Sequence, residues 1–291
     1  MTKEHRDKGA WFAAPLANRR PLHSDPAAPL RRGAGGDTQR AMTNIAQPDP
    51  ARFTRPHRPA LAYRHGPGRG PTIVFLPGYM SDMAGGKASA VAAAAASRGQ
   101  AWLLLDYAGC GLSDGRFADQ TLIDWRNDVL DLVAAKTDGP VLLVGSSMGG
   151  WLMLLVALAL PPERVAGLVG IAAAPDFTDW GFSDADKAIL QAEGQLLEDT
   201  PYSDQPYVTT RAFWDSGQAH RLLGAPIPLT CPVHLLHGQR DDDVPFAISL
   251  QLAAALASDA VTISLIKDGD HRLSRPQDIG LLLAAVAGMG R

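Results

Sequence analysis

Six short, nearly continuous apolar segments alternate with helix-like segments along this chain of 291 residues. The apolar segments are, in chain order, PTIVFL (71–76), AWLLL (101–105), PVLLV (140–144), RVAGLVGIA (164–172), PVHLL (232–236) and VTISLI (261–266). Such runs are typical of strands buried on both faces of a parallel sheet. Intervening segments such as TLIDWRNDVLDLVAAK and FAISLQLAAALA are helix-like. Strand alternating with helix predicts an α/β fold with a mostly parallel, doubly wound sheet.

One interval, between residues 175 and 225, interrupts this alternation. It contains no strand-like run, and we predict a helical cap inserted after the fourth apolar segment. It holds seven of the nineteen aromatic residues (eight Phe, six Trp, five Tyr), which either line an apolar pocket or pack the cap's own core. These seven are Phe177, Trp180, Phe182, Tyr202, Tyr207, Phe213 and Trp214.

The N-terminal segment differs from the rest in composition. Residues 1–41 hold eight Lys or Arg against four Asp or Glu, with much Ala, Pro and Gly and no apolar periodicity. Such a segment buries too little apolar surface to offset its ordering entropy. We therefore predict a disordered extension over residues 1–50 and a folded domain over residues 51–291. The segment lacks the apolar core of a secretory signal, so we expect a cytoplasmic protein, with an Arg-rich organelle-targeting peptide as the open alternative.

Composition argues against several partner and cofactor classes. A net charge of −3 gives no sign of nucleic-acid binding. Cys110 and Cys231 are far apart, and the eight histidines form no HExxH or His-rich tract, so we predict neither a metal nor a cofactor. The uncharged stretch 141–160 has the length of a membrane span, but the central GSSMGG favours strand, turn and helix, and we predict no transmembrane segment. The sequence leaves the oligomeric state open.

The pattern Gly-x-Ser-x-Gly occurs twice, around Ser113 and around Ser147. A nucleophilic serine of this kind lies on a sharp turn from a strand into a helix, because the turn projects its hydroxyl above the sheet. VLLV leads directly into the segment of Ser147, and MGGWLMLLVALAL follows it. Ser113 lies seven residues beyond LLLD in a glycine-rich loop, followed by GRFADQ. We predict Ser147 as the nucleophile and Ser113 as a loop residue.

A serine nucleophile needs a base and an acid that orients the base. The order serine, acid, histidine is that of the α/β-hydrolase arrangement, in which the acid and the base follow strand ends. His271, in DGDHR after VTISLI, is the only histidine beyond the acidic run Asp241 to Asp243, and we predict it as the base. The spacing HG-x-x-D favours Asp241 as the acid, with Asp242 as the alternative. His237 is assigned a structural role in the same turn.

An oxyanion intermediate needs two fixed N–H donors. We expect one to be the backbone N–H of Met148, at the start of the helix that follows the serine. The other is expected in the loop LPGYMSDM after the first apolar segment, where Gly78 allows a turn and the backbone N–H of Tyr79 points inward.

Taken together, the segments LPGYMSDMAGGKA, LLDYAGCGLSDG, TLIDWRNDVLDLV, GSSMGGWLMLL, CPVHLLHGQRDDDVP and DGDHR resemble those of the α/β-hydrolase-fold serine hydrolases. Over residues 60–288 the chain resembles the mitochondrial palmitoyl-protein thioesterases that also cleave acyl glucuronides, and their bacterial relatives. The resemblance implies the α/β-hydrolase fold, with Ser147 as nucleophile, Asp241 as acid and His271 as base. It also implies that the loop around Ser113 shapes the site without supplying a nucleophile.

These observations predict a serine hydrolase without a cofactor, a carboxylesterase or thioesterase acting on small or acylated substrates. Within enzymes, the alternatives are a carbon–carbon bond hydrolase or a peptidase on the same triad. From another class, the alternative is a non-catalytic binding protein of this fold.

Overall fold

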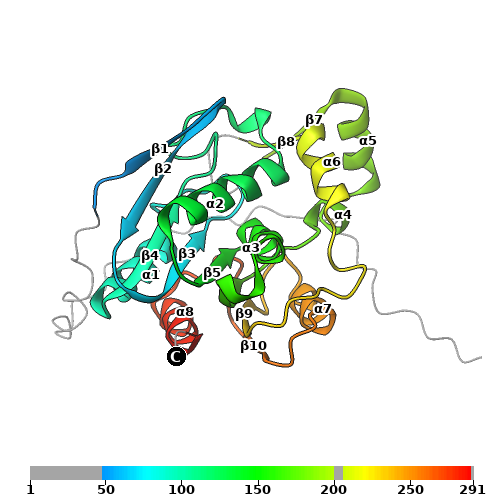
Figure 1. The fold of residues 1–291 in the computed structure, drawn as a ribbon. Coiled ribbons are helices and arrows are strands. Elements are labelled where there is room, and N and C mark those ends of the chain that lie inside the picture. Colours follow the sequence, from blue (N-terminus) through cyan, green and yellow to red (C-terminus); the bar gives the residue numbers. More distant parts are fainter. Residues whose placement is uncertain (1–47, 200–205, 290–291) are drawn as a thin grey trace, which may run out of the picture. The chain divides into compact units, whose positions relative to one another are not determined.

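The computed structural model describes residues 48–199 and 206–289. The predicted N-terminal extension lies outside them except for its last three residues, and so does Tyr202. An eight-stranded sheet forms the centre of the described domain, in the order β1-β2-β4-β3-β5-β6-β9-β10 (Figure 1). Its strands are β1 (Ala51–Arg55), β2 (Arg58–Gly66), β3 (Arg69–Leu76), β4 (Gln100–Leu105), β5 (Val141–Ser146), β6 (Val165–Ile171), β9 (Val233–Gly238) and β10 (Val261–Ile266).

The six apolar segments become the six parallel strands β3, β4, β5, β6, β9 and β10. β5 is buried along its whole length between β3 and β6. β10 lies at an edge and is only partly buried, because it has a neighbour on one side only. β1 and β2, which the sequence pattern did not predict, form an antiparallel pair at the opposite edge, with β2 antiparallel to β4. The predicted fold class, with its mostly parallel sheet, is confirmed.

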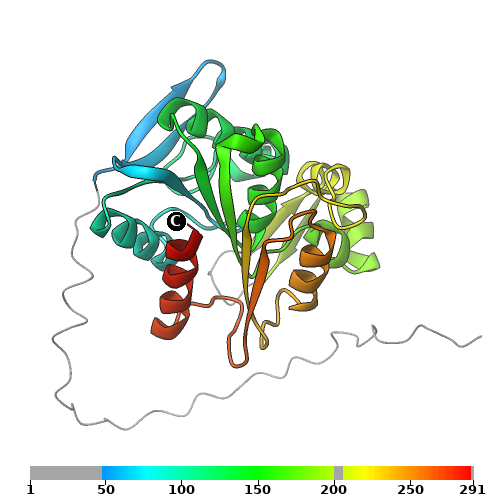
Figure 2. The same cartoon turned by 60° about the horizontal axis from the view of Figure 1, so that its bottom comes forward.

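Helices cover both faces of the sheet (Figure 2). One apolar cluster contains side chains of α2, α3 and α7, and the other contains side chains of α1 and α8. A capping box between Thr121 and Asp124 starts α2, whose Trp125 and Val129 then face the core. The helices are α1 (Gly86–Ser97), α2 (Leu122–Lys136), α3 (Met148–Ala159), α7 (Ala247–Ala255) and α8 (Pro276–Met289), with two short 3₁₀ helices, η1 (Phe117–Asp119) and η2 (Pro162–Arg164).

The cap follows β6, as the sequence indicates, but it is not entirely helical. It contains α4 (Phe177–Trp180), α5 (Asp184–Glu193), β7 (Gln195–Glu198), β8 (Tyr207–Thr210) and α6 (Arg211–Ala219). β7 and β8 pair as a separate antiparallel sheet. The sequence analysis missed these strands because each has only four residues and neither is a continuous apolar run. Asp176, at the start of the cap, accepts hydrogen bonds from the N–H groups of Leu222 and Leu223 near its end.

The uncharged stretch 141–160 divides into β5, the turn at Ser147, and α3. Ten of the twelve residues of α3 are buried, and Trp151 is fully covered. The absence of charge thus reflects burial in the domain core on both sides of a turn. Within 48–199 and 206–289, no helix is long and apolar enough to cross a membrane.

Candidate active site

Ser147 occupies a strained turn between the carboxyl end of β5 and the first residue of α3. Its φ of 54° and ψ of −121° lie in a region that L-residues rarely adopt. β6 and the segment after it hold this geometry in place: the Ser147 N–H donates to the carbonyl of Ile171 at 2.9 Å, and the Ser147 carbonyl accepts from the Ala174 N–H at 3.0 Å. Such strain persists only where the surroundings fix it, and it is characteristic of functional positions.

The two glycines that flank Ser147 are required by the close approach of backbone. A Cβ on Gly145 would lie 2.3 Å from the carbonyl oxygen of Gly149. A Cβ on Gly149 would lie 2.1 Å from the carbonyl oxygen of Leu76, at the end of β3. Both obstacles are main-chain atoms that a rotamer change cannot move. The glycine spacing therefore allows α3 to start directly against the ends of β3 and β5.

The predicted acid and base reach Ser147 from the loops that follow β9 and β10. His271 Nε2 lies 3.2 Å from Ser147 Oγ, and His271 Nδ1 lies 2.9 Å from Asp241 Oδ2. An ionised carboxylate only accepts hydrogen bonds, so Nδ1 carries the proton and donates it to Asp241. The Nε2 lone pair then faces the serine hydroxyl. The structure thus brings together Ser147, His271 and Asp241, which are distant in the sequence, in one chain of hydrogen bonds.

Asp241 is held by more than this one contact. Its Oδ1 accepts the backbone N–H groups of Asp243 at 2.9 Å and Val244 at 2.7 Å. Burial by itself raises the pKa of this carboxyl, but hydrogen bonds from His237, His271 and the Val244 N–H outweigh that effect and hold the pKa well below the ordinary value. Asp241 is therefore ionised at neutral pH. Asp242, the alternative acid, is exposed.

His237 adds a second imidazole behind Asp241, a contact that the sequence analysis did not foresee. It is fully buried, and its Nε2 lies 2.9 Å from the carbonyl of Val244 and 3.2 Å from Asp241 Oδ2. Because a carbonyl only accepts hydrogen bonds, Nε2 carries the proton, and its N–H points toward both the Val244 carbonyl and Asp241 Oδ2. The other ring nitrogen, Nδ1, lies 2.7 Å from Ser249 Oγ. The sequence offers one signal for this contact: in HG-x-x-D, His237 and Asp241 are four residues apart, a spacing at which a tight turn brings two side chains together.

Tyr79 and Met148 both line the cavity beside the serine turn. Gly78 packs directly against it: a Cβ there would lie 3.3 Å from the Ser146 carbonyl and 3.4 Å from Ser147 Cβ. Met148 is the first residue of α3, where backbone N–H groups have no partner within the helix. The side chain of Tyr79 turns toward the cap, and its hydroxyl donates to the carbonyl of Val208 at 2.7 Å. Burial raises its pKa above the ordinary value.

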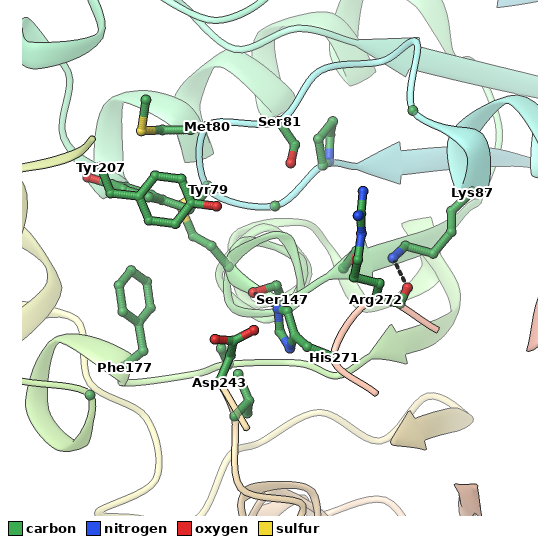
Figure 3. Close-up of a pocket in the computed structure, with 18 of the residues that line it drawn as sticks. Tyr79, Met80, Ser81, Lys87, Ser147, Phe177, Tyr207, Asp243, His271 and Arg272 are labelled. Atoms are coloured by element: carbon green, nitrogen blue, oxygen red, sulfur yellow. Dashed lines mark hydrogen bonds between the residues drawn. The ribbon is translucent and has the colours of Figure 1, made fainter. Parts of the chain in front are cut away.

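A cavity of about 700 Å³ opens onto Ser147 and His271 (Figure 3). This volume suits an organic substrate of moderate size. Four of the cap aromatics line the cavity, namely Phe177, Trp180, Phe182 and Tyr207. Phe213 instead belongs to the main core, and Trp214 packs beside the cluster of Phe182, Leu190 and Leu196. Both interpretations of the cap aromatics, pocket lining and internal packing, therefore apply, and Phe182 does both.

Ser113 does not line this cavity. Its Oγ accepts the backbone N–H of Ala62 at 2.8 Å and donates to the carbonyl of Asp106 at 2.7 Å. It therefore ties its loop to β2 and to the end of β4.

The described residues contain one group whose ligand atoms lie close enough together for a metal. Asp241, Asp243 and His271 have such atoms within 4.8 Å of one another. Both oxygens of Asp241 and Nδ1 of His271 already take part in hydrogen bonds, so a metal would displace the contacts described above. We assign no metal or cofactor to this group.

Comparison with known proteins identifies the family. A family model described as the alpha/beta hydrolase fold matches residues 71–223. The chain belongs to this α/β-hydrolase family. It is 41% identical over 236 residues to the mitochondrial palmitoyl-protein thioesterase ABHD10 of Rattus norvegicus, covering 80% of this chain and 79% of the relative. The human protein of the same name is also 41% identical, over 238 residues.

Two solved structures are similar to this chain in fold. Alpha/beta hydrolase domain-containing protein 10 from mouse has a TM-score of 0.78 and 38% identity, covering 83% of this chain and 98% of its own. A putative hydrolase from Agrobacterium vitis S4 also has a TM-score of 0.78, with 36% identity over 84% of this chain and 99% of its own. The resemblance drawn from sequence motifs is thus confirmed. The cytoplasmic location expected for this chain finds no support, because the thioesterase relatives are named as mitochondrial.

Proposed function

We propose that this protein is a serine hydrolase that cleaves carboxylic esters or acyl thioesters through an acyl-enzyme on Ser147. One observation carries the proposal: an unbroken series of contacts leads from Ser147 Oγ through both nitrogens of His271 to the buried carboxylate of Asp241. This series opens onto a cavity of about 700 Å³. Its order and polarity are those of a nucleophile, a base and an orienting acid.

The chemistry follows from the protonation states. Ser147 Oγ attacks the acyl carbonyl carbon while His271 Nε2 accepts its proton, and Asp241 stabilises the imidazolium that forms. The bond to the leaving oxygen or sulfur then breaks, and Nε2 returns the proton to that atom. Water attacks the acyl-serine with His271 again as the base, and the acid product and free Ser147 are released.

We assign the developing oxyanion to the backbone N–H groups of Tyr79 and Met148. Both flank the turn of Ser147, and neither assignment depends on a side chain. Such donors stabilise charge that appears only in the transition state, and losing one costs about 3 kcal/mol.

The substrate class is proposed from the cavity and from the relatives. Phe177, Trp180 and Tyr207 provide apolar surface toward the cap and suit an apolar acyl or aryl group. The thioesterase names of the relatives add acyl thioesters to the esters that a serine hydrolase of this geometry cleaves.

A fluorophosphonate probe followed by mass spectrometry tests the mechanism, with the adduct expected on Ser147 alone. A folded protein that takes no label would instead favour a non-catalytic binding protein. A series of acyl esters and acyl-CoA thioesters of increasing chain length tests the substrate class. Hydrolysis of neither series, together with cleavage of peptides or carbon–carbon bonds, would replace it with one of those activities.

A further inference from the structure

The turn that carries the Tyr79 N–H, one of the two proposed oxyanion donors, has an unfavourable backbone conformation. It follows β3, and the Ser81 N–H donates to the Gly78 carbonyl at 3.2 Å, which closes the turn 78–81. Met80, the third residue of this turn, has a φ of 52°, in the left-handed region that favours glycine. In Figure 3 the labelled side chains of this turn lie above Ser147. A conformation of this kind persists only where neighbouring groups hold it in place.

Two adjacent residues hold the chain on either side of the turn 78–81. Asp106 and Tyr107 directly follow β4, which runs parallel to β3 as its neighbour in the sheet. The Tyr107 hydroxyl donates to the Pro77 carbonyl at 3.0 Å, immediately before the turn. Asp106 Oδ1 accepts the Met83 N–H at 2.7 Å, shortly after the turn. Both side chains are buried, so water does not compete for either hydrogen bond.

The Pro77 carbonyl lies close to both proposed donors. It belongs to the peptide unit that leads into Gly78, and the next peptide unit carries the Tyr79 N–H. The same carbonyl packs against the start of α3, because a Cβ on Gly149 would lie 2.5 Å from its oxygen. Gly149 directly follows Met148, which carries the other proposed donor. A hydrogen bond that fixes the Pro77 carbonyl therefore fixes the chain between the two N–H groups.

Tyr107 is fully buried outside the cavity, so it does not touch a substrate bound there. Its ring packs against Trp125 with the ring centroids 5.8 Å apart, a contact that a phenylalanine ring would also make. Burial raises the pKa of Tyr107 well above its ordinary value, so the hydroxyl keeps its proton and donates it. We propose that Tyr107 is a positioning residue: by holding the Pro77 carbonyl, it keeps the Tyr79 N–H aimed at the oxyanion. This proposal rests on the proposed function and adds to it a residue outside the cavity.

The variant Tyr107→Phe removes the hydroxyl and keeps the ring. We expect kcat and kcat/KM toward p-nitrophenyl octanoate to fall together by about tenfold per folded molecule, because the donor is needed in the transition state and not in the bound substrate. This loss is smaller than the loss of about 100-fold or more that follows when a donor is removed outright, because the Tyr79 N–H is still present but less well aimed. Circular dichroism measures the folded fraction.

An octyl trifluoromethyl ketone and the corresponding alcohol form a matched pair of inhibitors. In the proposed mechanism Ser147 Oγ adds to the ketone carbon, His271 takes the hydroxyl proton, and the oxyanion that forms lies between the two N–H donors. The alcohol has the same chain but no carbonyl carbon to attack. Tyr107→Phe should weaken inhibition by the ketone about tenfold and change inhibition by the alcohol by less than about twofold.

A second variant and a control complete the comparison. Asp106→Asn replaces the charge-assisted bond to the Met83 N–H by a neutral one, and it should weaken inhibition by the ketone selectively, by a smaller factor. It carries the test if Tyr107→Phe does not fold. Thr137→Val removes another buried hydroxyl, which donates to the Val133 carbonyl at 2.7 Å at the end of α2. This control should lower the free energy of unfolding in urea and leave kcat and both inhibition constants unchanged.

Two results would overturn the role of Tyr107. One is a Tyr107→Phe protein with wild-type kcat and wild-type inhibition by the ketone, in which the Ser81 N–H and the cap contact of Tyr79 are enough to hold the turn. The other is an equal loss of affinity for the ketone and the alcohol, which would give the hydroxyl a general structural role. A wild-type protein that neither hydrolyses the ester nor reacts with fluorophosphonate would instead overturn the proposed function.

Discussion

The segments around Ser147 and Ser113 share the Gly-x-Ser-x-Gly spacing, yet the two serines face different partners. Ser147 has a φ of 54° between β5 and α3, and its hydroxyl faces His271 at the edge of a cavity. The hydroxyl of Ser113 is occupied by the Ala62 N–H and the Asp106 carbonyl. The Ser147 hydroxyl faces an imidazole nitrogen, whereas the Ser113 hydroxyl completes a loop.

The glycines of the two segments also lie close to different kinds of atom. Gly149 makes room for the Leu76 carbonyl, so that a helix can begin against a strand. Gly111 has a φ of +50°, and a Cβ there would lie 2.2 Å from Asp106 Oδ2. The shared spacing therefore indicates crowding around a turn in both places. Only Ser147 has a strand directly before it and a helix directly after it, so that its hydroxyl lies at the edge of the cavity.

Exchanging each serine for alanine should separate the two segments most strongly. Ser147→Ala is expected to lower kcat toward p-nitrophenyl acyl esters at least several hundredfold, because it removes the proposed nucleophile. Ser113→Ala should keep kcat within about twofold per folded molecule, because Ser113 does not line the cavity. The comparison uses kcat per folded molecule, with the folded fraction measured by circular dichroism. Loss of activity in Ser113→Ala with retention in Ser147→Ala would reverse the assignment.

Replacing a glycine by alanine should lower the free energy of unfolding by different amounts in the two segments. Gly149→Ala is expected to lower the free energy of unfolding by about 3 kcal/mol or more, because a backbone carbonyl stands in the way. Gly111→Ala should cost about 2 kcal/mol, from the positive φ and a clash with a side chain that can shift slightly, and should keep kcat. Gly280→Ala, where no atom lies within 4 Å of the added Cβ in α8, is the control and should gain about 0.5–1 kcal/mol. Urea denaturation measures all three. Equal losses in the first two would mean that the turn of Ser147 is no more constrained than the loop of Ser113.

Ser113→Ala tests the structural role of the second serine directly. The Ala62 N–H would lose its acceptor in a partly buried position, at a cost of about 1–2 kcal/mol. Ser97→Ala, which removes an exposed hydroxyl bound to the Ala94 carbonyl, should change the free energy of unfolding by less than about 0.5 kcal/mol. A Ser113→Ala variant as stable as wild type in urea would show that the loop does not depend on its serine.

Much of the fold could be predicted because the apolar runs are long relative to a strand and occur at regular intervals. All six of them became parallel strands, and the cap lies where the alternation stops. The sequence pattern missed β1 (ARFTR) and β2 (RPALAYRHG) because Arg, and in β2 also His, interrupts their apolar residues. It missed β7 and β8 because four residues are too few to show a period.

The sequence was enough to name candidate residues for the site, but not to predict which side chains contact one another there. Ser147, Asp241 and His271 were placed by chain order and strand ends, which fix where a residue lies in a doubly wound sheet. The contact of His237 with Asp241 depends on how tightly one turn closes, and the contact of Tyr107 with Pro77 depends on how the segments after β3 and β4 pack. Neither distance is encoded in a local pattern, so both required the tertiary structure.

The smallest expected difference between the two regions concerns the buried carboxyl behind each serine. Asp241 has a lowered pKa, so its contribution to stability is present above its unfolded pKa of about 4 and is lost as the pH falls toward its folded value. Burial raises the pKa of Asp106 against its hydrogen bonds from the Leu112 and Met83 N–H groups. Its folded form therefore binds a proton more readily than the unfolded form, and the stability it contributes increases as the pH falls through that window. Urea denaturation from pH 7 down through this range should show a shallower acid loss in Asp241→Asn than in wild type and a steeper one in Asp106→Asn. If both variants changed the slope in the same direction, the two carboxyls would not differ as their surroundings indicate.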